Sequence, residues 1–259
     1  MKIVVLVKHV PEPTASWRFA DDLTLDRQGV DGRLAELDEY AVEQAIRLAE
    51  AGVATEIVFL TMGPARALEG LRKALAMGGD SGIHVLDDAL HGSDAAGTSL
   101  VLATALKRTG FDLVVCGMAS TDGEMSVVPV MVAERLGVPA LADAGSLGVD
   151  GSSITVSRDA DDATETLRAS LPAVVSVTDR TGEARYPSFK GIVAGKKKPV
   201  AIWSLADLGI APERVGAAGS GTVVRAVRPR PPREAGTVIT DDGDAAARLA
   251  DFLAANKLL

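Results

Sequence analysis

The feature that most constrains the fold is the repeated alternation of short apolar runs with longer segments of helical periodicity. The runs at residues 3–7, 56–61 and 113–116 are apolar along most of their length, as in strands buried on both faces of a parallel sheet. Between them, apolar side chains recur every three or four residues, for example in the helix expected at residues 38–52. This order predicts a doubly wound, mostly parallel α/β sheet with right-handed crossovers and helices on both faces.

The remaining elements are predicted by turn and capping signals. They are a helix opened by Gly63 and Pro64, a strand at residues 83–86, a helix capped by Ser93, a helix carrying Val127, Val130 and Met131, and a strand at residues 173–177. At residues 154–157 and 164–168, apolar and polar residues alternate around an acidic turn. This alternation predicts an antiparallel hairpin added to the sheet.

The last part of the chain has a different composition. Residues 211–236 are rich in Gly, Pro and Arg without periodicity, which predicts an extended arm, and residues 244–256 are typical of a short amphipathic helix. We therefore expect an α/β domain at residues 1–200, with a surface segment at 183–199, and an extension at residues 201–259 that docks onto a partner. A tail that folds back onto its own domain is the alternative.

Charge and composition exclude several classes of protein. The net charge of −8, the pI near 5.0 and the 3% aromatic content argue against a nucleic-acid-binding protein. The single cysteine, Cys116, excludes an internal disulfide framework and a cysteine-based zinc or iron–sulfur site. No stretch reaches the roughly 18 apolar residues of a membrane span, so we expect a cytoplasmic protein without membrane insertion.

No familiar motif for catalysis or metal binding is present. The glycine spacing at residues 216–221 and 191–197 differs from the dinucleotide and phosphate-loop fingerprints, and the three histidines lack ligand spacing. We therefore expect no catalytic residue and no metal site. Redox chemistry in this chain would require a bound organic cofactor.

One loop has the features of an anion site. Residues 117–129 run from a strand end directly into a helix N-terminus, where unpaired backbone N–H groups and the helix dipole favour negative charge. An ordinary capped turn is an equally good interpretation. Asp122 and Glu124 would repel a phosphate unless they point away from it or bind ribose hydroxyls.

A second loop has the features of an interaction surface. Residues 185–200 are polar and follow a buried strand, yet they include Tyr186, Phe189 and Ile192. Apolar side chains surrounded by charge on a surface are typical of a docking site. The alternative is that Phe189 and Ile192 fold inward as part of the local core.

At these residues the chain resembles the beta subunits of electron-transfer flavoproteins. The resemblance covers nearly the whole chain and rests on the segments LVKHV, LDEYAVEQAIRL, LRKALAMGGDSGIHV, GMASTDGEMSVVPVMVAERLGVP, SRDADDATETLRASLPAVVSV and RYPSFKGIVAGKKKPV. It implies a Rossmann-like, adenine-nucleotide-binding fold. It also implies a heterodimer with an alpha subunit, which carries electrons from flavin dehydrogenases such as the acyl-CoA dehydrogenases of fatty acid oxidation to a quinone oxidoreductase or another acceptor.

The resemblance further implies two cofactors. FAD would lie mainly in the alpha subunit, and AMP would be bound structurally in this chain. The AMP positions that match the family are Leu6, Ala35, Glu36, Leu37, Asp38, Met62, Asp122, Gly123, Glu124, Met125, Ser126, Val127, Val128 and Pro129. An Asn-Pro pair common in the family is replaced here by Ala35 and Glu36, and an Asn-Gln-Thr run by residues 126–128, so fewer side chains are available to bind the phosphate.

Two further groups of residues are implied by the same resemblance. The recognition segment, residues 183–199, would bind partner dehydrogenases, with Phe189 at the position of an apolar anchor that is commonly leucine. Its expected partner-binding residues are Arg185, Tyr186, Phe189, Ile192, Lys196 and Lys197. Arg158 and Asp159 match an Arg-Glu pair that positions the mobile flavin domain, although an exposed turn with weak ion pairs explains them as well.

Two other functions remain open. The chain could belong to an electron-bifurcating relative in which a second FAD occupies the AMP site. It could also be a stand-alone nucleotide-binding module of the stress-protein type, which would leave the recognition segment and the C-terminal extension without a role.

Overall fold

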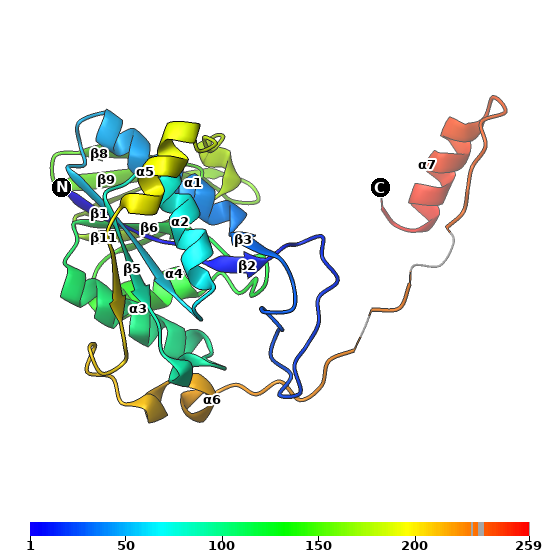
Figure 1. Cartoon of the computed structure of the whole chain (residues 1–259). Coiled ribbons are helices and arrows are strands. Elements are labelled where there is room, and N and C mark those ends of the chain that lie inside the picture. The colour runs from blue at the N-terminus through cyan, green and yellow to red at the C-terminus, as the bar shows by residue number, and fades with distance from the viewer. Residues whose placement is uncertain (229, 233–235, 259) are drawn as a thin grey trace. The chain divides into compact units, whose positions relative to one another are not determined.

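The computed structural model describes residues 1–228, 230–232 and 236–258, and its chain divides into two units, Met1–Arg225 and Ala226–Leu259 (Figure 1). The first unit contains a seven-stranded sheet in which every pair of neighbours is parallel. In spatial order its strands are β12 (Val200–Trp203), β5 (Ser81–Val85), β4 (Glu56–Met62), β1 (Lys2–Leu6), β6 (Leu113–Gly117), β11 (Ala173–Val177) and β7 (Ala140–Ala144). The predicted doubly wound α/β sheet is therefore confirmed.

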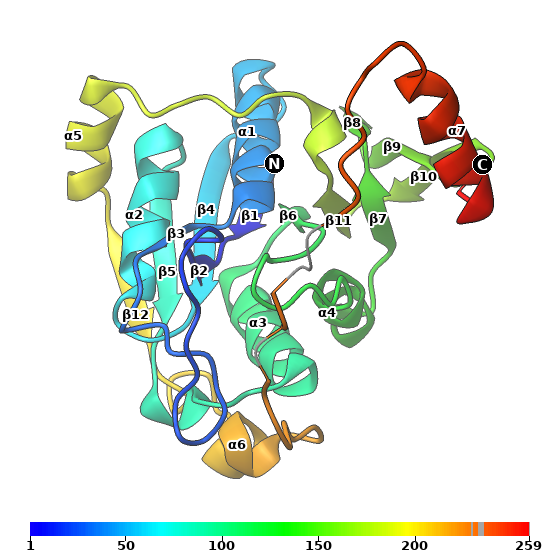
Figure 2. The same ribbon diagram turned by 90° about the vertical axis from the view of Figure 1, so that its right-hand side faces the viewer.

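Helices cover both faces of this sheet (Figure 2). They are α1 (Glu36–Glu50), α2 (Ala67–Met77), α3 (Ala95–Thr109) and α4 (Val128–Leu136), whereas α5 (Phe189–Lys197) packs on the outside of α2. Alternate residues of β1 point to opposite faces, so that Ile3 and Val5 pack with α1 and α2, and Val4 and Leu6 pack with α3 and α4. Both faces are buried, which explains why the strands are continuous apolar runs.

The predicted hairpin is confirmed, but it is not part of the main sheet. Strands β9 (Ser153–Asp159) and β10 (Thr164–Ser170) pair with β8 (Ser146–Asp150) in a separate three-stranded antiparallel sheet. Strand β8 escaped prediction because its five residues, SLGVD, include only two large apolar side chains. A further pair, β2 (His9–Pro11) and β3 (Gly32–Leu34), flanks a long excursion at residues 12–31.

Two helix predictions require correction. Helix α3 is capped by Asp94, whose Oδ1 accepts the Gly97 N–H at 2.9 Å, and not by Ser93. The Ser93 hydroxyl instead accepts the Gly216 N–H at 2.8 Å. The apolar positions expected for α4 are also wrong, because Val127 and Val130 are exposed and the buried residues are Pro129, Val132 and Ala133. Helix α4 begins at Val128. Tertiary packing buries a different face of this helix from the one that the three expected apolar residues suggested.

The expected arm at residues 211–236 begins later than predicted. Short helices η3 (Pro212–Arg214) and α6 (Gly216–Gly219) lie within the first unit, and Val215 between them is fully buried. The expected domain boundary at residue 200 also lies inside this unit, because β12 extends the sheet from Val200 onward. In the second unit, α7 (Ala245–Ala255) forms where a helix was predicted. Within the described ranges, no helix has the length and apolarity needed to cross a bilayer.

Candidate functional site

The sheet topology defines where a ligand can bind. The chain leads from β1 through β4 to β5 on one side, and then returns to place β6 and β11 on the other side of β1. The switch point therefore lies between β1 and β6, and ligands of open α/β sheets bind beyond the carboxyl ends of such strands. Four segments meet there: the end of β1, the start of α1, the end of β4 and the loop between β6 and α4. These segments and the first two residues of α4 contain all the expected nucleotide-binding residues.

Asp38 ties three of these segments together. Its carboxylate accepts the Lys8 backbone N–H at 2.8 Å and the Gly117 N–H at 3.0 Å, so the start of α1 is bound to the ends of β1 and β6. A side chain at Gly117 would collide with Asp38 and Leu37, because a Cβ there would lie 2.7 Å from the Asp38 carboxylate. Burial raises the pKa of Asp38 to about 7, against the opposing effect of the two N–H donors.

Asp122 is the centre of a second polar cluster. Its side chain has 0% exposure and contacts two cations, Lys8 Nζ at 2.8 Å and the Arg27 guanidinium. Lys8 Nζ also donates to the Ser120 hydroxyl at 3.0 Å. Although burial opposes ionisation, the charges of Lys8 and Arg27 lower the pKa of Asp122 to about 2. Asp122 therefore points into its own ion pairs, and the cluster of two cations and one anion has a net positive charge.

Lys8 and Arg27 were not identified from the sequence. Lys8 lies 114 residues from Asp122, and Arg27 lies in an excursion without periodicity, so no local pattern connects them. The only signal was an acidic residue in a loop that otherwise suits an anion. Such a residue requires a counter-charge when it is buried.

The segment that carries Arg27, residues 12–31, is bound at two points, by Arg66 and by Asp122. The Arg66 guanidinium, at the start of α2, donates to the backbone carbonyls of Val30 at 2.7 Å and Gln28 at 3.2 Å. Asp26 Oδ1 accepts the Gln28 N–H at 3.0 Å, which forms a turn around Arg27. The segment therefore connects the loop after β4, through Arg66, to the loop after β6, through Asp122.

The loop between β6 and α4 presents its backbone to solvent. Residues 123–127 are exposed, and Glu124 and Ser126 adopt left-handed conformations with φ of 48° and 54°. The N-cap of helix α4, Val127, makes no side-chain cap hydrogen bond, and among the described residues the N–H groups of residues 125–128 have no hydrogen-bond acceptor. Alternation between left-handed and ordinary backbone directs neighbouring N–H groups to one side, as in protein anion sites. The start of α4 thus lacks the side-chain cap that an ordinary capped turn would provide.

The other expected nucleotide-binding residues differ in exposure. Leu6, Ala35 and Pro129 are buried, Leu37 and Met62 are half-buried, and Glu36 is exposed. A hollow of about 350 Å³ lies near the amino-terminal ends of the central strands and is lined by Lys2, Glu56, Arg108 and Trp203 among others. The candidate site is identified by its backbone donors and its charged side chains.

The recognition segment is partly helical and presents aromatic side chains. Tyr186 is 90% exposed and Phe189 is 83% exposed, so Phe189 does not fold into the core. Phe189 begins α5, whose N-cap Ser188 accepts the Gly191 N–H at 3.0 Å. Ile192 on the same helix is also exposed, as are Lys196 and Lys197.

Helix α5 packs closely on α2. A Cβ on Gly191 would lie 2.4 Å from the carbonyl oxygen of Ala76, and one on Gly195 would lie 2.8 Å from the Ala76 Cα, so only glycine allows this approach. Each helix also caps the other. Arg72 of α2 donates to the carbonyls of Gly195 at 3.0 Å and Lys198 at 2.8 Å, while Lys198 Nζ donates to the Leu75 and Gly78 carbonyls of α2 at 2.8 Å. The backbone of α5 is therefore firmly fixed.

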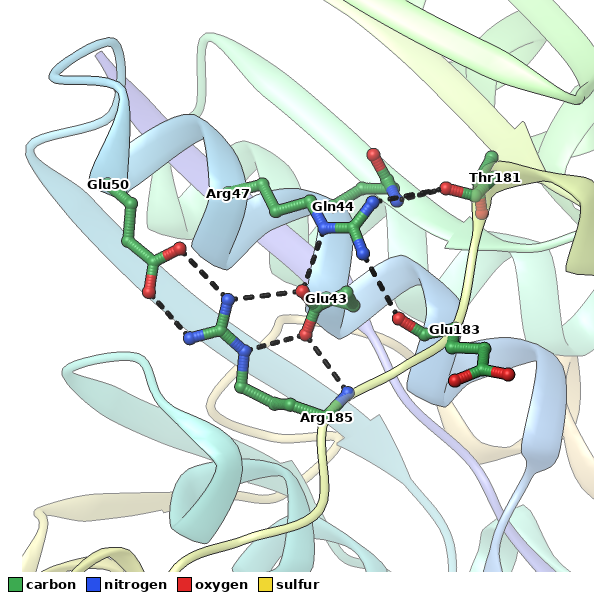
Figure 3. Close-up of polar contacts among 7 residues, drawn as sticks. All are labelled: Glu43, Gln44, Arg47, Glu50, Thr181, Glu183 and Arg185. Carbon is green, nitrogen blue, oxygen red and sulfur yellow. Dashed lines mark hydrogen bonds and ion pairs between the residues drawn. The ribbon is translucent and has the colours of Figure 1, made fainter.

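Arg185, at the entry to the segment, is bound to α1 (Figure 3). Its Nε donates to Glu43 Oε2 at 2.7 Å and its Nη1 to Glu50 Oε1 at 2.6 Å, while Nη2 contacts both carboxylates. Arg47 donates to Glu43 from the other side at 2.8 Å and holds the Glu183 carbonyl at 3.1 Å. The guanidinium expected to meet a partner is thus engaged within the chain.

Arg158 and Asp159 lie next to each other on β9 but have different partners. Arg158 Nε contacts Glu165 Oε2 at 2.5 Å across the hairpin, and Asp159 accepts the Thr164 hydroxyl at 2.7 Å and contacts Arg180. Neighbouring residues of a strand point to opposite faces, which explains the separate partners. Both side chains are on the surface, where such pairs contribute little to stability.

Comparison with known proteins identifies the family. The family described as "Electron transfer flavoprotein domain" matches residues 22–208. The chain is 44% identical to the protein named "Electron transfer flavoprotein subunit beta" of Mycobacterium leprae and 42% identical to that of Mycobacterium tuberculosis, with 99% of each chain covered. It is 32% identical to "Caffeyl-CoA reductase-Etf complex subunit CarD" of Acetobacterium woodii, over 93% of this chain and 92% of that protein. The chain therefore belongs to the electron transfer flavoprotein family, among proteins named as its beta subunits.

Proposed function

We propose that this chain forms a heterodimer with an alpha subunit and serves, in the cytoplasm, as part of an electron carrier and not as an enzyme. The carrier takes electrons from flavin dehydrogenases, such as those acting on acyl-CoA substrates, and delivers them to a quinone oxidoreductase or another acceptor. FAD, held mainly by the alpha subunit, supplies the redox chemistry when it is bound. The observation that carries this proposal is the exposed Phe189 on a fixed backbone, in a chain that matches beta subunits over its whole length.

The carrier role assigns two tasks to surface residues of this chain. Phe189 anchors the dehydrogenase, with Tyr186, Ile192, Lys196 and Lys197 around it, because a buried aromatic anchor with a polar surround provides most of the affinity of many transient interfaces. Arg158 and Asp159 act on the flavin domain, where they favour one of its orientations. Each task concerns binding or orientation, and neither requires proton transfer.

The chain also holds AMP as a structural ligand in this proposal. Its phosphate lies at the N-terminus of α4, against the N–H groups of residues 125–128, and its adenosine lies between the ends of β1 and β4 and the start of α1. Lys8 provides a cation at the phosphate, and Asp122 does not repel the phosphate because two cations neutralise it. Helix α1, like α4, begins without a side-chain cap, and among the described residues the N–H groups of Glu36 and Leu37 have no acceptor, so they provide further backbone donors for the nucleotide.

Nucleotide analysis of the purified heterodimer tests the cofactor proposal. The chain is co-expressed with its alpha subunit, the complex is denatured, and the released nucleotides are separated and quantified. One FAD and one AMP per heterodimer support the carrier. Two FAD and no AMP place the protein with electron-bifurcating relatives, a possibility favoured by its similarity to CarD. Failure to form a flavin-containing heterodimer contradicts the carrier role and favours a stand-alone nucleotide-binding module.

A single substitution tests the docking role of Phe189. We expect Phe189→Ala to raise the KM of the dehydrogenase for the carrier by about tenfold or more, since loss of a central anchor typically costs at least 1–2 kcal/mol. The flavin content of the heterodimer should remain unchanged, because the side chain is exposed. Val223→Ala, which also removes an exposed apolar side chain, is the control. Unchanged transfer kinetics for Phe189→Ala would remove the anchor from the proposal.

A second substitution tests the phosphate site. We expect Lys8→Gln to lower the affinity of the heterodimer for AMP by roughly tenfold or more, because a hydrogen bond to a charged group contributes about 1.5–3 kcal/mol. Affinity is measured by calorimetry after exchange of the bound nucleotide. Lys107→Gln, on an exposed part of α3, serves as the matched control. Equal AMP affinity in the two variants would exclude Lys8 from the site.

A further inference from the structure

The entry to the recognition segment is fixed by one buried carboxylate. Glu43 lies in the middle of α1, and its side chain is only 4% exposed. It accepts the Arg185 backbone N–H at 3.2 Å, Arg185 Nε at 2.7 Å and Arg185 Nη2 at 3.1 Å, as well as Arg47 Nε at 2.8 Å (Figure 3). We propose that Glu43 and Arg185 form a clamp that positions the recognition segment for its dehydrogenase, so that Arg185 acts without touching the partner. This inference rests on the proposed function.

The hydrogen bonds of Arg185 argue against direct contact with a partner. Four of its five N–H donors are directed to Glu43 and Glu50, which leaves one donor for any other group. Hydrogen bonds with Glu50 and Glu43 raise the pKa of Arg185 above its usual range. The planar guanidinium directs its N–H donors to two carboxylates in a fixed fork, a geometry that the rotatable ammonium group of lysine does not provide. Arg185 is therefore suited to hold the chain in place.

The clamp fixes the backbone immediately before the aromatic residues. Arg47 holds the Glu183 carbonyl at 3.1 Å, and Gln44 holds the Thr181 carbonyl at 3.0 Å, so α1 binds the chain at several points from Thr181 to Arg185. After Phe189, the chain is fixed again where Gly191 meets α2. Tyr186 and Phe189 thus lie in a short stretch between two fixed points. A surface fixed before binding loses less conformational entropy when the partner docks.

Loss of the clamp should weaken docking without changing the chemistry. In the purified heterodimer, with an acyl-CoA dehydrogenase as electron donor, we expect Glu43→Gln to raise the KM for the carrier by about tenfold, the cost of about 1.4 kcal/mol for ordering the freed residues. The kcat and the flavin content should stay within about twofold of the parent protein. We expect Arg185→Lys, which keeps the charge but not the fork geometry, to raise the KM as well.

A second readout detects the loosened segment itself. Hydrogen exchange of the Arg185 N–H, which Glu43 accepts at 3.2 Å, should become faster in Glu43→Gln, while exchange in the central sheet stays unchanged, because local opening does not require global unfolding. Glu134→Gln removes an exposed carboxylate of α4 and is the matched control for both measurements. If Glu43→Gln does not yield a folded heterodimer, Glu50→Gln removes the exposed carboxylate that also binds Arg185, and about a threefold rise in KM is expected.

The outcomes separate the clamp from the proposed function. If Arg185→Gln raises the KM while the exchange and KM of Glu43→Gln match the parent, Arg185 contacts the partner directly and the clamp is wrong. If Glu50→Gln has to replace Glu43→Gln and leaves the KM unchanged, the clamp is likewise wrong. If Phe189→Ala also leaves the KM unchanged, the recognition surface itself is wrong. A raised KM for Phe189→Ala together with an unaffected Glu43→Gln overturns the clamp alone.

Discussion

Two exposed segments of this protein, the loop between β6 and α4 and the recognition segment, follow buried strands of the same sheet but differ in how their helices begin. Helix α4 has Val127 as its N-cap, with no side-chain hydrogen bond, and is preceded by two residues with left-handed backbone. Helix α5 has a Ser188 cap and is fixed to α2 by two glycines and reciprocal caps. The first segment offers backbone donors, and the second offers side chains on a satisfied backbone.

This difference shows how a loop's backbone determines the kind of ligand it suits. Unsatisfied N–H groups at a helix N-terminus attract an anion, and a side-chain cap would compete for the same donors. A capped and closely packed helix has few donors left, so its binding capacity resides in exposed side chains such as Phe189. The ion pairs of the two segments also differ. At the first, one carboxylate, Asp122, binds two cations, and at the second, one cation, Arg185, binds the carboxylates of Glu43 and Glu50.

The largest effect is expected from removal of the carboxylate at the first segment. Asp122→Ala should lower the free energy of unfolding by roughly 2–4 kcal/mol, since it leaves Lys8 and Arg27 next to each other, with allowance for their partial exposure. Denaturant unfolding of the chain measures the change. Asp162→Ala, in the exposed hairpin turn, should change stability by less than about 0.5 kcal/mol. Similar stability of the two variants would mean that the buried charges do not hold this region.

A pH-dependent effect is expected from Asp38. Its pKa is raised to about 7 in the folded chain, so the folded state binds a proton that the unfolded state has already lost, and stability falls as pH rises toward 7. Between pH 5 and 8 the loss amounts to roughly 2–3 kcal/mol, at about 1.4 kcal/mol per pH unit below the folded pKa. Asp38→Asn should remove this slope while costing stability at pH 5, because one backbone N–H loses its acceptor. An unchanged slope in the variant would assign the pH dependence to other groups.

A moderate effect is expected at the contact between α5 and α2. Gly195→Ala should destabilise the protein by about 1–3 kcal/mol, because its methyl group would meet backbone atoms of Ala76. Gly148→Ala is the control, because Gly148 has open space around it and an ordinary φ. Gly209 also has open space around it, but its positive φ would strain an alanine. Thermal unfolding of Gly195→Ala and Gly148→Ala compares a tight with an open position. Equal melting temperatures would show that α5 can move away from α2 without cost.

The smallest effect on stability is expected for the proposed anchor. Phe189→Ser should change the free energy of unfolding by less than about 0.5 kcal/mol, because an exposed side chain loses little packing. Chemical denaturation measures this value alongside the kinetic test of docking. Destabilisation above 1 kcal/mol would indicate that Phe189 packs within the chain. The recognition segment would then not offer Phe189 as a free side chain, and it would no longer differ in this respect from the loop before α4.

Much of the fold was predictable because its elements have strong local patterns. The strands ending at Leu6, Gly117 and Val177 are short apolar runs, and the hairpin of β9 and β10 alternates clearly. Strand β12 was not predicted, because VAIW follows a lysine run and is half-exposed at the sheet edge, so its pattern was not that of a buried strand. The cap of α3 was misplaced by one residue, since Ser93 and Asp94 are both good N-cap residues.

The candidate site was predictable only in part. The loop at residues 117–129 was identified from its position between a strand and a helix, and the exposure of Tyr186 and Phe189 agrees with the surface segment predicted around them. The partners of the charged residues could not be predicted. Asp122 meets Lys8 and Arg27, and Arg185 meets Glu43, across separations of more than 90 residues.

The sequence by itself determined the alternation of the central strands and helices along the chain and the family to which the chain belongs. Both are encoded in local periodicity and contiguous motifs, which do not depend on distant contacts. Only the tertiary structure decided which charges neutralise each other and which backbone donors remain unpaired. These properties arise because folding brings together the ends of β1, β4 and β6, and because burial forces each charge in that region to find a partner wherever the chain supplies one.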